Sequence, residues 1–317
     1  MSAESKSATF ASVAIRKPVA PANRLAVLAA FFSIYVIWGS TYLAIRYAVA
    51  SIPPLYTAGF RHLVAGSILL LWAFAKGLRP TWPQIRASLV IGFLFFLVGH
   101  GSLHWAETKV PSGLASLLIA SEPIWVFLMG CAAEKRWRMN GFLLAGVVLG
   151  LAGVALLLGR DVWSAGSGAF WGAVACLIGA ISWSAGIVYS RRSHLSGSPL
   201  LLSALSLLAG SAMLLATGTL LGEYRGFSFQ DVPLRAWLSL AYLIVFGSVI
   251  AFSAYNWLLE HYSPTLVATH TYVNPVVAVL LGWWLAGEHV SVNVLLSAAM
   301  VIAALFLVDR GMVRLKP

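Results

Sequence analysis

Two stretches of seventeen residues decide the fold: WGSTYLAIRYAVASIPP at positions 38–54 and WSAGIVYSRRSHLSGSP at positions 183–199. The first tryptophan, the arginine eight residues later and the final proline recur in both stretches at one offset of 145 residues. Three uncommon residue types that keep the same register indicate an internal duplication. The chain is therefore expected to contain two copies of one structural unit.

A second set of matches extends the duplication toward the carboxyl end of each copy. Tryptophan and proline recur there at offsets of 152 or 153: Trp105 with Trp257, Pro111 with Pro264, and Pro123 with Pro275. The change from 145 fits a longer loop in the second copy, around residues 222–231. The alternative is that tryptophan and proline punctuate any set of membrane helices, but the shared register favours a repeat.

Composition places this chain in a membrane. Of its 317 residues, 60% are hydrophobic and only 10% are charged, with a mean hydropathy of +0.87. A soluble domain carries about 25% charged residues, so this chain cannot cover itself with a polar surface. The net charge of +11 lies mostly at the ends of apolar segments, so we expect no nucleic-acid partner. Cys131 and Cys176 lie within apolar segments and are expected to be small buried residues rather than a disulfide.

Ten apolar segments are long enough to be membrane helices, since about 20 apolar residues span a bilayer. Prolines stand at or near the start of six of them, where the missing N–H of proline is tolerated. The predicted helices cover residues 24–47, 54–76, 83–105, 111–134, 140–158, 168–190, 199–221, 233–258, 264–286 and 291–309.

Basic residues predict how the helices are oriented. With the amino terminus in the cytoplasm, fifteen lysines and arginines fall on the inner side and five on the outer side, and Arg61 remains inside a helix. The positive-inside rule therefore predicts that both termini are cytoplasmic. Residues 1–23 are expected to form a disordered cytoplasmic tail.

The number of helices in each copy determines how the copies are related. Five is odd, so two successive copies must point in opposite directions, as in the inverted repeats of secondary transporters. The predicted fold is an all-α integral membrane protein with ten transmembrane helices, in repeats at residues 24–160 and 161–317. The second repeat includes a short cytoplasmic tail.

Several motifs resemble those of EamA-type proteins of the drug/metabolite transporter superfamily: VIWGSTY at 36–42, GFR at 59–61, FGS at 246–248, SP at 263–264, YVNPVVA at 272–278 and GE at 287–288. The resemblance covers about residues 24–309. It implies a bacterial inner-membrane exporter of amino acids or similar metabolites, with a central cavity between helices one to four and six to nine. It also implies that helices five and ten lie at the periphery.

Glu122 is predicted to lie near the middle of the membrane, roughly 16 Å from the start of helix four at Pro111. Pro123 follows it and is expected to break the helix, and the repeat mate is Asn274 with Pro275. Paired helix breaks in both halves mark the binding site of many transporters. Glu122 is therefore a candidate partner for a substrate amine or a proton-coupling carboxylate, the alternative being a buried acid satisfied by a neighbour.

Basic residues at depth supply the other polar candidates. Arg61 could bind a substrate carboxylate as a fork, although the resemblance favours a structural pair, since an arginine is usual there. His100, His104 and Glu107 form a His-x3-His-x2-Glu run that could hold a metal. Cavity-lining histidines and no metal are the preferred interpretation, and His270 has a similar status.

Aromatic and small residues complete the candidate set. Trp38 and Tyr42 share one face of helix one, and Trp183 is the repeat mate of Trp38, so the three are expected around one cavity. They suit an apolar or aromatic substrate, the alternative being ordinary packing or an interfacial belt. Helix five carries Gly146, Gly150 and Gly153, a spacing that permits close helix contact within the chain or in a dimer. Packing within the chain is preferred, and a monomer is favoured over a homodimer.

These patterns predict a secondary active transporter rather than an enzyme, with a small-molecule substrate and no cofactor. Export of amino acids with apolar or aromatic side chains across the bacterial inner membrane, by alternating access, fits best. A sugar phosphate would need several deep cations, and Arg61 is the one clear candidate. The alternatives are an exporter of other metabolites or drugs, an intramembrane metalloenzyme using His100, His104 and Glu107, and a passive channel.

Overall fold

The structure is a computed structural model that describes residues 24–134, 140–157, 166–193, 198–262, 264–267 and 269–314. All regular secondary structure in these residues is helical, which confirms the all-α fold. Eight helices are long and apolar enough to cross a membrane, and Gly141–Leu157 is a shorter apolar helix. The predicted tail at 1–23 and the repeat boundary at 160/161 lie outside the described residues. The count of ten spans and the inversion of the repeats stay predictions.

The first half of the chain contains five predicted segments, and the helices follow them closely. Three of these segments are compound, because a π-helix or a short break divides them. In order, the elements are α1 (Arg24–Phe32), η1 (Ser33–Ile37), α2 (Trp38–Val49), α3 (Pro54–Ala75), α4 (Trp82–Ile91), η2 (Gly92–His100), α5 (Gly101–Ala106), α6 (Ser112–Ile119), α7 (Glu122–Glu134) and α8 (Gly141–Leu157).

The second half follows a similar order. Its elements are α10 (Ser167–Arg192), α11 (Pro199–Leu220), the 3₁₀ turn η3 (Phe229–Asp231), α12 (Leu234–Tyr242), the π-helix η4 (Leu243–Ile250), α13 (Ala251–His261), α14 (Pro264–Val267), α15 (His270–Ala286) and α16 (Val292–Arg314). We call the end of the bundle where α2 ends and α3 begins the outer end, and the end where α1 begins the inner end. These names follow the orientation that the basic residues predict.

Local chemistry explains where several helices begin. Proline occupies the first turn of α3, α4 and α11, where its fixed φ suits a helix and its missing N–H costs nothing. α4 also has a capping box, in which the Thr81 backbone N–H donates to Gln84 Oε1 at 2.9 Å. At the outer end, α3 is capped from a distant loop, because Glu223 accepts from the N–H groups of Leu55 and Tyr56 at 3.1–3.2 Å.

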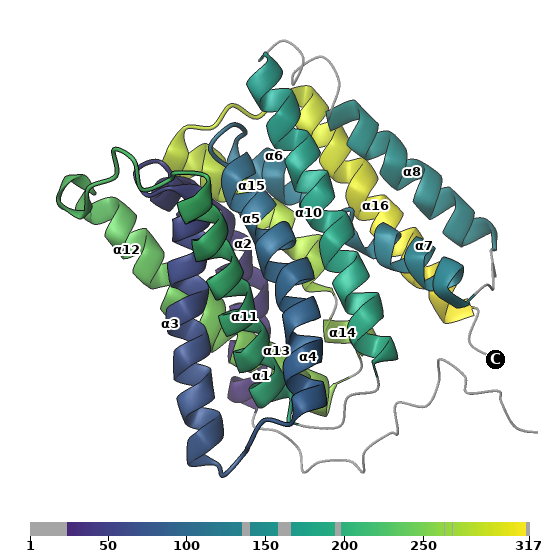
Figure 1. Ribbon diagram of the computed structural model, residues 1–317. Helices are drawn as coiled ribbons and strands as arrows, with labels where there is room; N and C mark the ends of the chain where they lie inside the picture. Colours follow the sequence, from purple (N-terminus) through teal and green to yellow (C-terminus); the bar gives the residue numbers. More distant parts are fainter. Residues whose placement is uncertain are drawn as a thin grey trace, which may run out of the picture.

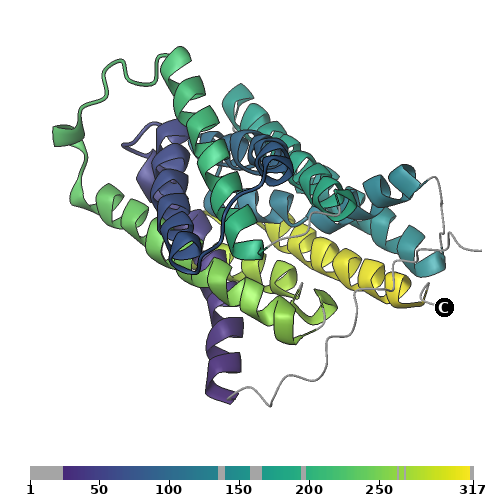
Figure 2. The same ribbon diagram turned by 60° about the horizontal axis from the view of Figure 1, so that its bottom comes forward.

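Helices α8 and α16 lie side by side along one edge of the bundle (Figures 1 and 2). The glycines of α8 make this contact possible. A Cβ at Gly146 would come within 2.9 Å of the Ala304 carbonyl, and a Cβ at Gly153 within 3.1 Å of Val301. The predicted close packing of these glycines within the chain is confirmed, and helices five and ten lie at the periphery as the resemblance implied.

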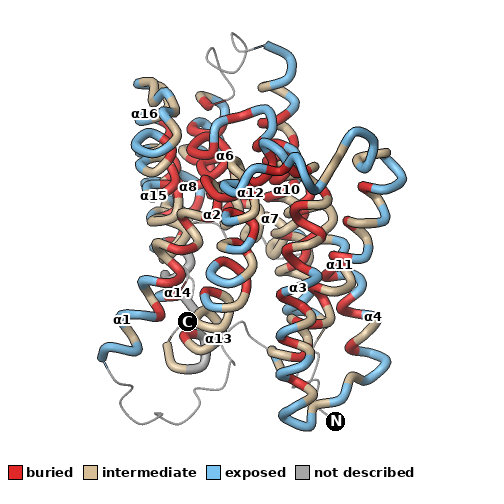
Figure 3. Tube along the Cα trace, turned by 90° about the vertical axis from the view of Figure 1, so that its left-hand side faces the viewer, coloured by how far each residue is buried: buried red, intermediate tan, exposed pale blue. Residues whose placement is uncertain are grey.

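The remaining helices surround a partly buried interior. α3 packs along α11, while η2 packs against both α10 and α11. Figure 3 shows α1 and α13 on one side of the molecule and α3, α4 and α11 on the other, with the buried residues on the faces turned inward. Three of the bundle's helices contain π-helical turns, and these turns lie at or next to the candidate site residues.

Candidate functional site

Trp38 lies in an aromatic cluster that joins both halves of the chain. Its indole Nε1–H donates to the Gly247 carbonyl at 3.0 Å, so helix one is attached to the π-helix η4. The Trp38 ring centroid lies 5.2 Å from that of Tyr255 on α13 and 5.0 Å from that of His270 on α15. The predicted site residues Trp38 and His270 are therefore neighbours, and Tyr255 joins them although no sequence pattern singled it out.

Trp183, the predicted repeat mate of Trp38, lies in a second cluster. Its ring stacks on Phe95 at a centroid distance of 4.3 Å and on His100 at 4.9 Å. Both partners belong to η2, so each tryptophan packs on helices of the other half of the chain. The two tryptophans thus lie in separate clusters, each half-buried, rather than packing on each other.

Glu122 begins α7. The two residues before it, Ala120 and Ser121, form a break between α6 and α7 within the predicted helix of residues 111–134. The backbone carbonyl of Glu122 accepts a hydrogen bond of 3.1 Å from Ser184 Oγ, which holds the break against α10. The carboxyl group is half-buried and lies within electrostatic reach of the hydroxyls of Tyr42 and Tyr255. These two tyrosines come from different halves of the chain, so residues of both halves lie near Glu122.

Asn274 contacts helix one rather than standing free. With its amide nitrogen turned toward them, it donates to the carbonyls of Ile34 and Tyr35 at 3.0 Å and to that of His270 at 3.1 Å. Ile34 and Tyr35 belong to η1, where a π-helix changes the usual pairing of carbonyls. The expected helix break at Pro275 is wrong, because α15 continues through it, and α14 instead ends at Val267, before α15 begins at His270. Neighbouring helices can supply the hydrogen bonds that a proline removes.

Arg61 is buried, and its side chain reaches the π-helix η4 in the second half of the chain. Its Nε donates to Ser248 Oγ at 2.9 Å, and its side chain is only 5% exposed. A Cβ at Gly247 would lie 3.3 Å from Nη2 of Arg61, so the FGS motif at 246–248 forms the surface on which the guanidinium rests. Ser248 is therefore a partner of Arg61 within the protein itself, which the sequence did not identify.

A chain of histidines follows Arg61 toward the outer end. His100 Nδ1 and His62 Nε2 share a hydrogen bond of 2.8 Å, and His104 Nδ1 is 2.7 Å from the His100 carbonyl oxygen. His104 and the adjacent Glu107 are completely buried, and no partner occurs among the described residues for His104 Nε2 or for either carboxylate oxygen of Glu107. No group of three or more possible metal ligands is found in the described part of the chain.

A network around Glu288 lies at the outer end of the bundle, and we call it the outer latch. Arg46 Nε forms an ion pair of 3.2 Å with Glu288 Oε1, and its Nη1 donates to the carbonyls of Glu107 and Val110. Glu288 also accepts from the Ser112 N–H, the Ser112 hydroxyl and the Gly113 N–H, at 2.8–3.1 Å. It thereby caps α6 and links this helix to α2, which carries Arg46, and to the end of α15. Sequence reasoning counted Arg46 only as an outer charge and Glu288 only as part of a motif.

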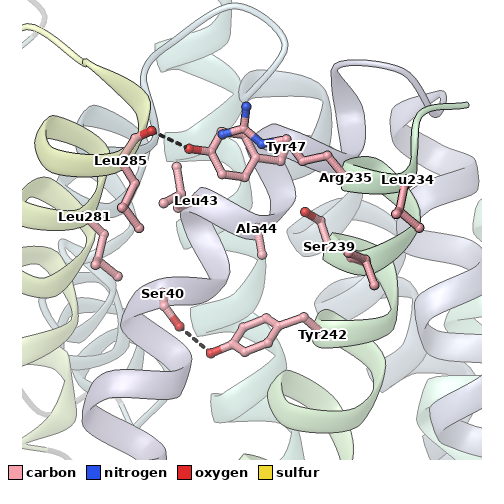
Figure 4. A pocket seen from close by; sticks show the side chains of 11 residues that line it. Ser40, Leu43, Ala44, Tyr47, Leu234, Arg235, Ser239, Tyr242, Leu281 and Leu285 are labelled. Atoms are coloured by element: carbon pink, nitrogen blue, oxygen red, sulfur yellow. Dashed lines mark hydrogen bonds between the residues drawn. The ribbon is translucent and has the colours of Figure 1, made fainter.

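A shallow apolar groove of about 590 Å³ lies between α2, α12 and α15 (Figure 4). A hydrogen bond of 2.7 Å between Ser40 and Tyr242 crosses its floor, and the Arg235 guanidinium lies 3.4 Å over the Tyr47 ring at its upper rim. Leu234 and Leu238 are largely exposed, so the groove faces outward. None of the predicted site residues lines it.

Comparison with known proteins agrees with this architecture. The model of the EamA-like transporter family matches residues 24–159 and 170–309. The chain is 39% identical to the uncharacterized inner membrane transporter YedA of Escherichia coli, over 90% of this chain and 92% of that one. It is 25% identical to the uncharacterized transporter YoaV of Bacillus subtilis, over 89% and 96% of the two chains. One solved crystal structure shares the fold with a TM-score of 0.62 and 22% identity, over 90% of this chain and 97% of that chain.

Proposed function

Because the chain belongs to the EamA-like transporter family, we propose that it exports amino acids with apolar or aromatic side chains across the bacterial inner membrane. The observation that carries the proposal is the position of Glu122 at a helix break, where Ser184 holds its backbone carbonyl and its carboxyl group lies within electrostatic reach of Tyr255, which packs on Trp38. A carboxylate at this depth suits a substrate ammonium group, and the flanking rings suit an apolar side chain.

The polar groups of the interior also argue against more highly charged substrates. Two or more negative charges would call for several buried cations. Arg61 is the one buried arginine among the residues whose burial is described. Its Nε already donates to Ser248. A single guanidinium or one of the histidines is enough for the carboxylate of a zwitterion. Glu122 is then the amine partner and, between substrates, the proton-coupling candidate.

Alternating access supplies the transport step of this proposal. The outer latch ties α2, α6 and the segment after α15 together, and in this proposal it keeps the outer end closed. Export requires a second conformation in which the Arg46–Glu288 pair is broken and the substrate leaves on that side. Rocking of the two halves around a site near the midplane is the usual way in which duplicated transporters achieve this change.

Counterflow in proteoliposomes tests the substrate. Vesicles preloaded with phenylalanine, tryptophan, methionine or threonine should take up the same labelled amino acid, whereas vesicles loaded with a sugar phosphate should not. Glu122→Gln should abolish counterflow of the amino acids, because the ammonium group loses its charged partner. Glu223→Gln is the matched control, since Glu223 caps α3 at the outer end, and it should transport normally. Exchange of the sugar phosphate but of none of the amino acids would overturn the proposal.

A further inference from the structure

Glu107 occupies an unusual position for a carboxylic acid. It follows the last residue of α5, its side chain is 1% exposed, and neither carboxylate oxygen has a hydrogen-bond partner within the described part of the chain. An ionised carboxylate buried without partners is very costly, so the group must carry a proton in this conformation. Burial raises the pKa of Glu107 well above its usual range, and the nearby charge of Glu288 raises it further.

The outer latch passes directly over Glu107. Arg46, whose Nε pairs with Glu288, uses Nη1 to donate to the backbone carbonyl of Glu107 at 3.3 Å. The guanidinium therefore joins the side chain of Glu288 to the backbone of Glu107, whose own carboxyl group is buried and has no partner in the described part of the chain. If Glu107 lost its proton, the two carboxylates would compete for the same cation and repel each other.

Other titratable groups face Glu107 from each neighbouring helix. Arg61 of α3 and Tyr42 of α2 lie within electrostatic reach, as does the thiol of Cys176 on α10. His104 is one turn away on the same helix, with Nε2 unpartnered among the described residues. The cations Arg46 and Arg61 favour ionisation of Glu107, but their effect is smaller than that of burial.

We propose that Glu107 is a proton-binding site that controls the outer latch. One proton from the outer solution binds the Glu107 carboxylate, Arg46 then pairs with Glu288, and the outer end closes. Two histidines on the same helix extend from this site over roughly 10 Å: His104, and then His100, whose ring centroid lies 5.9 Å from that of His104, shares a hydrogen bond with His62 and stacks on Trp183. The proton leaves along these histidines toward the central site, so that export of one substrate is exchanged for entry of one proton.

This inference rests on the proposed function, since it supplies the coupling ion for that transport. It also sets the direction of the pH effect. A carboxyl group whose pKa is raised in the closed state stabilises that state fully at low pH, and the stabilisation is lost as the pH rises through the closed-state pKa. Within this window, one proton changes the ratio of closed to open protein by up to about tenfold per pH unit.

Cysteine labelling measures the opening of the latch without any substrate. Val110 is fully buried and accepts from Arg46 only through its backbone carbonyl, so Val110→Cys leaves the latch intact. In full-length protein with Cys131→Ser and Cys176→Ala, a membrane-impermeant maleimide is added to the outer side of proteoliposomes. Exposed Thr108→Cys provides the reference for the reactivity of the thiol at each pH.

The normalised labelling rate of Val110→Cys should rise with increasing pH, at pH values above the usual range of a glutamate pKa, because burial raises the pKa of Glu107. Glu107→Gln should give slow labelling at every pH, and Glu107→Asp should keep the rise but move its midpoint. Glu288→Gln should give fast labelling even at low pH, because Arg46 loses its charged partner. Glu223→Gln should leave the rise unchanged.

Two comparisons separate this inference from the proposed function. Glu122→Gln should lose amino-acid counterflow and yet keep the pH-dependent labelling. In the parent protein, a proton gradient should drive amino-acid accumulation, and Glu107→Gln should abolish it. A rise that persists in Glu107→Gln, or parent labelling that ignores pH, would overturn the proton site whatever the substrate is. Failure of every amino acid to exchange, with labelling as expected, would overturn only the substrate assignment.

Discussion

Arg61 is the one basic residue that the charge pattern leaves inside a helix, and in the structure its Nε donates to Ser248 Oγ at 2.9 Å. Both groups are buried, with Arg61 on α3 and Ser248 on η4. Two interpretations were open from sequence, a substrate fork and a structural pair. The observed bond occupies the Nε of Arg61, and a role of the guanidinium in binding substrate stays a prediction.

Removal of this bond should be visible as a loss of stability. Ser248→Ala leaves the buried Nε–H of Arg61 without an acceptor, which costs about 1–3 kcal/mol. We expect a lower midpoint of thermal unfolding in detergent. The substrate concentration for half-maximal counterflow should change by less than about twofold, which corresponds to under about 0.5 kcal/mol. Ser239→Ala, at a buried serine of α12 in the shallow apolar groove, should shift neither quantity. A large rise in the half-maximal concentration with unchanged stability would instead assign Ser248 to substrate binding.

At the scale of helices, the glycines of α8 determine how closely two peripheral helices approach. Gly146 lies against Val308 and the backbone of α16, whereas Gly141 at the start of the same helix has no neighbour within 4 Å. The hydrophobic effect does not drive helices together inside a bilayer, so such close packing is a main source of helix association there. The two glycines therefore allow one substitution to be compared in two environments.

Gly146→Leu should destabilise the fold by about 1–3 kcal/mol, because a large side chain overpacks the contact with α16. Gly141→Leu should have little effect. The thermal unfolding midpoint of each purified variant, followed by tryptophan fluorescence in detergent, checks this prediction. Equal midpoints for the two variants would mean that α8 does not depend on close packing against α16.

The π-helical turns show what helix periodicity alone cannot predict. η2 at 92–100 and η4 at 243–250 occur near corresponding places in the two copies, and they carry His100 and the Gly247–Ser248 pair. Apolar residues such as GFLFFLVGH read as an ordinary membrane helix, because a π-turn changes only the pairing of backbone groups. Its position depends on which partners, such as Trp38 or Arg61, reach the helix from elsewhere in the fold.

For the whole molecule, the distribution of basic residues predicts that both termini face the cytoplasm. A reporter enzyme that is active only in the periplasm should be inactive when it is fused after Pro317. The same enzyme inserted between Thr108 and Lys109, in the loop before α6 that carries an outer charge, should be active. Activity of the carboxyl-terminal fusion would reverse the orientation, and with it the names inner and outer that we use for the latch.

The sequence by itself determined the membrane environment, the helical class, the family and most helix ends. These depend on apolar length, proline positions and short motifs, which are local properties of the chain. The break predicted at Pro123 lies instead just before Glu122, at Ala120 and Ser121, and α7 continues through Pro123.

Only the tertiary structure decided which polar groups meet. The pairing of Arg46 with Glu288, of Arg61 with Ser248 and of His62 with His100 joins residues 38 to 242 positions apart. No spacing in a single sequence records such contacts, because they depend on how the helices pack and rotate against each other. The buried, unpartnered carboxyl group of Glu107 became visible for the same reason, since burial belongs to the assembled bundle and not to the residue.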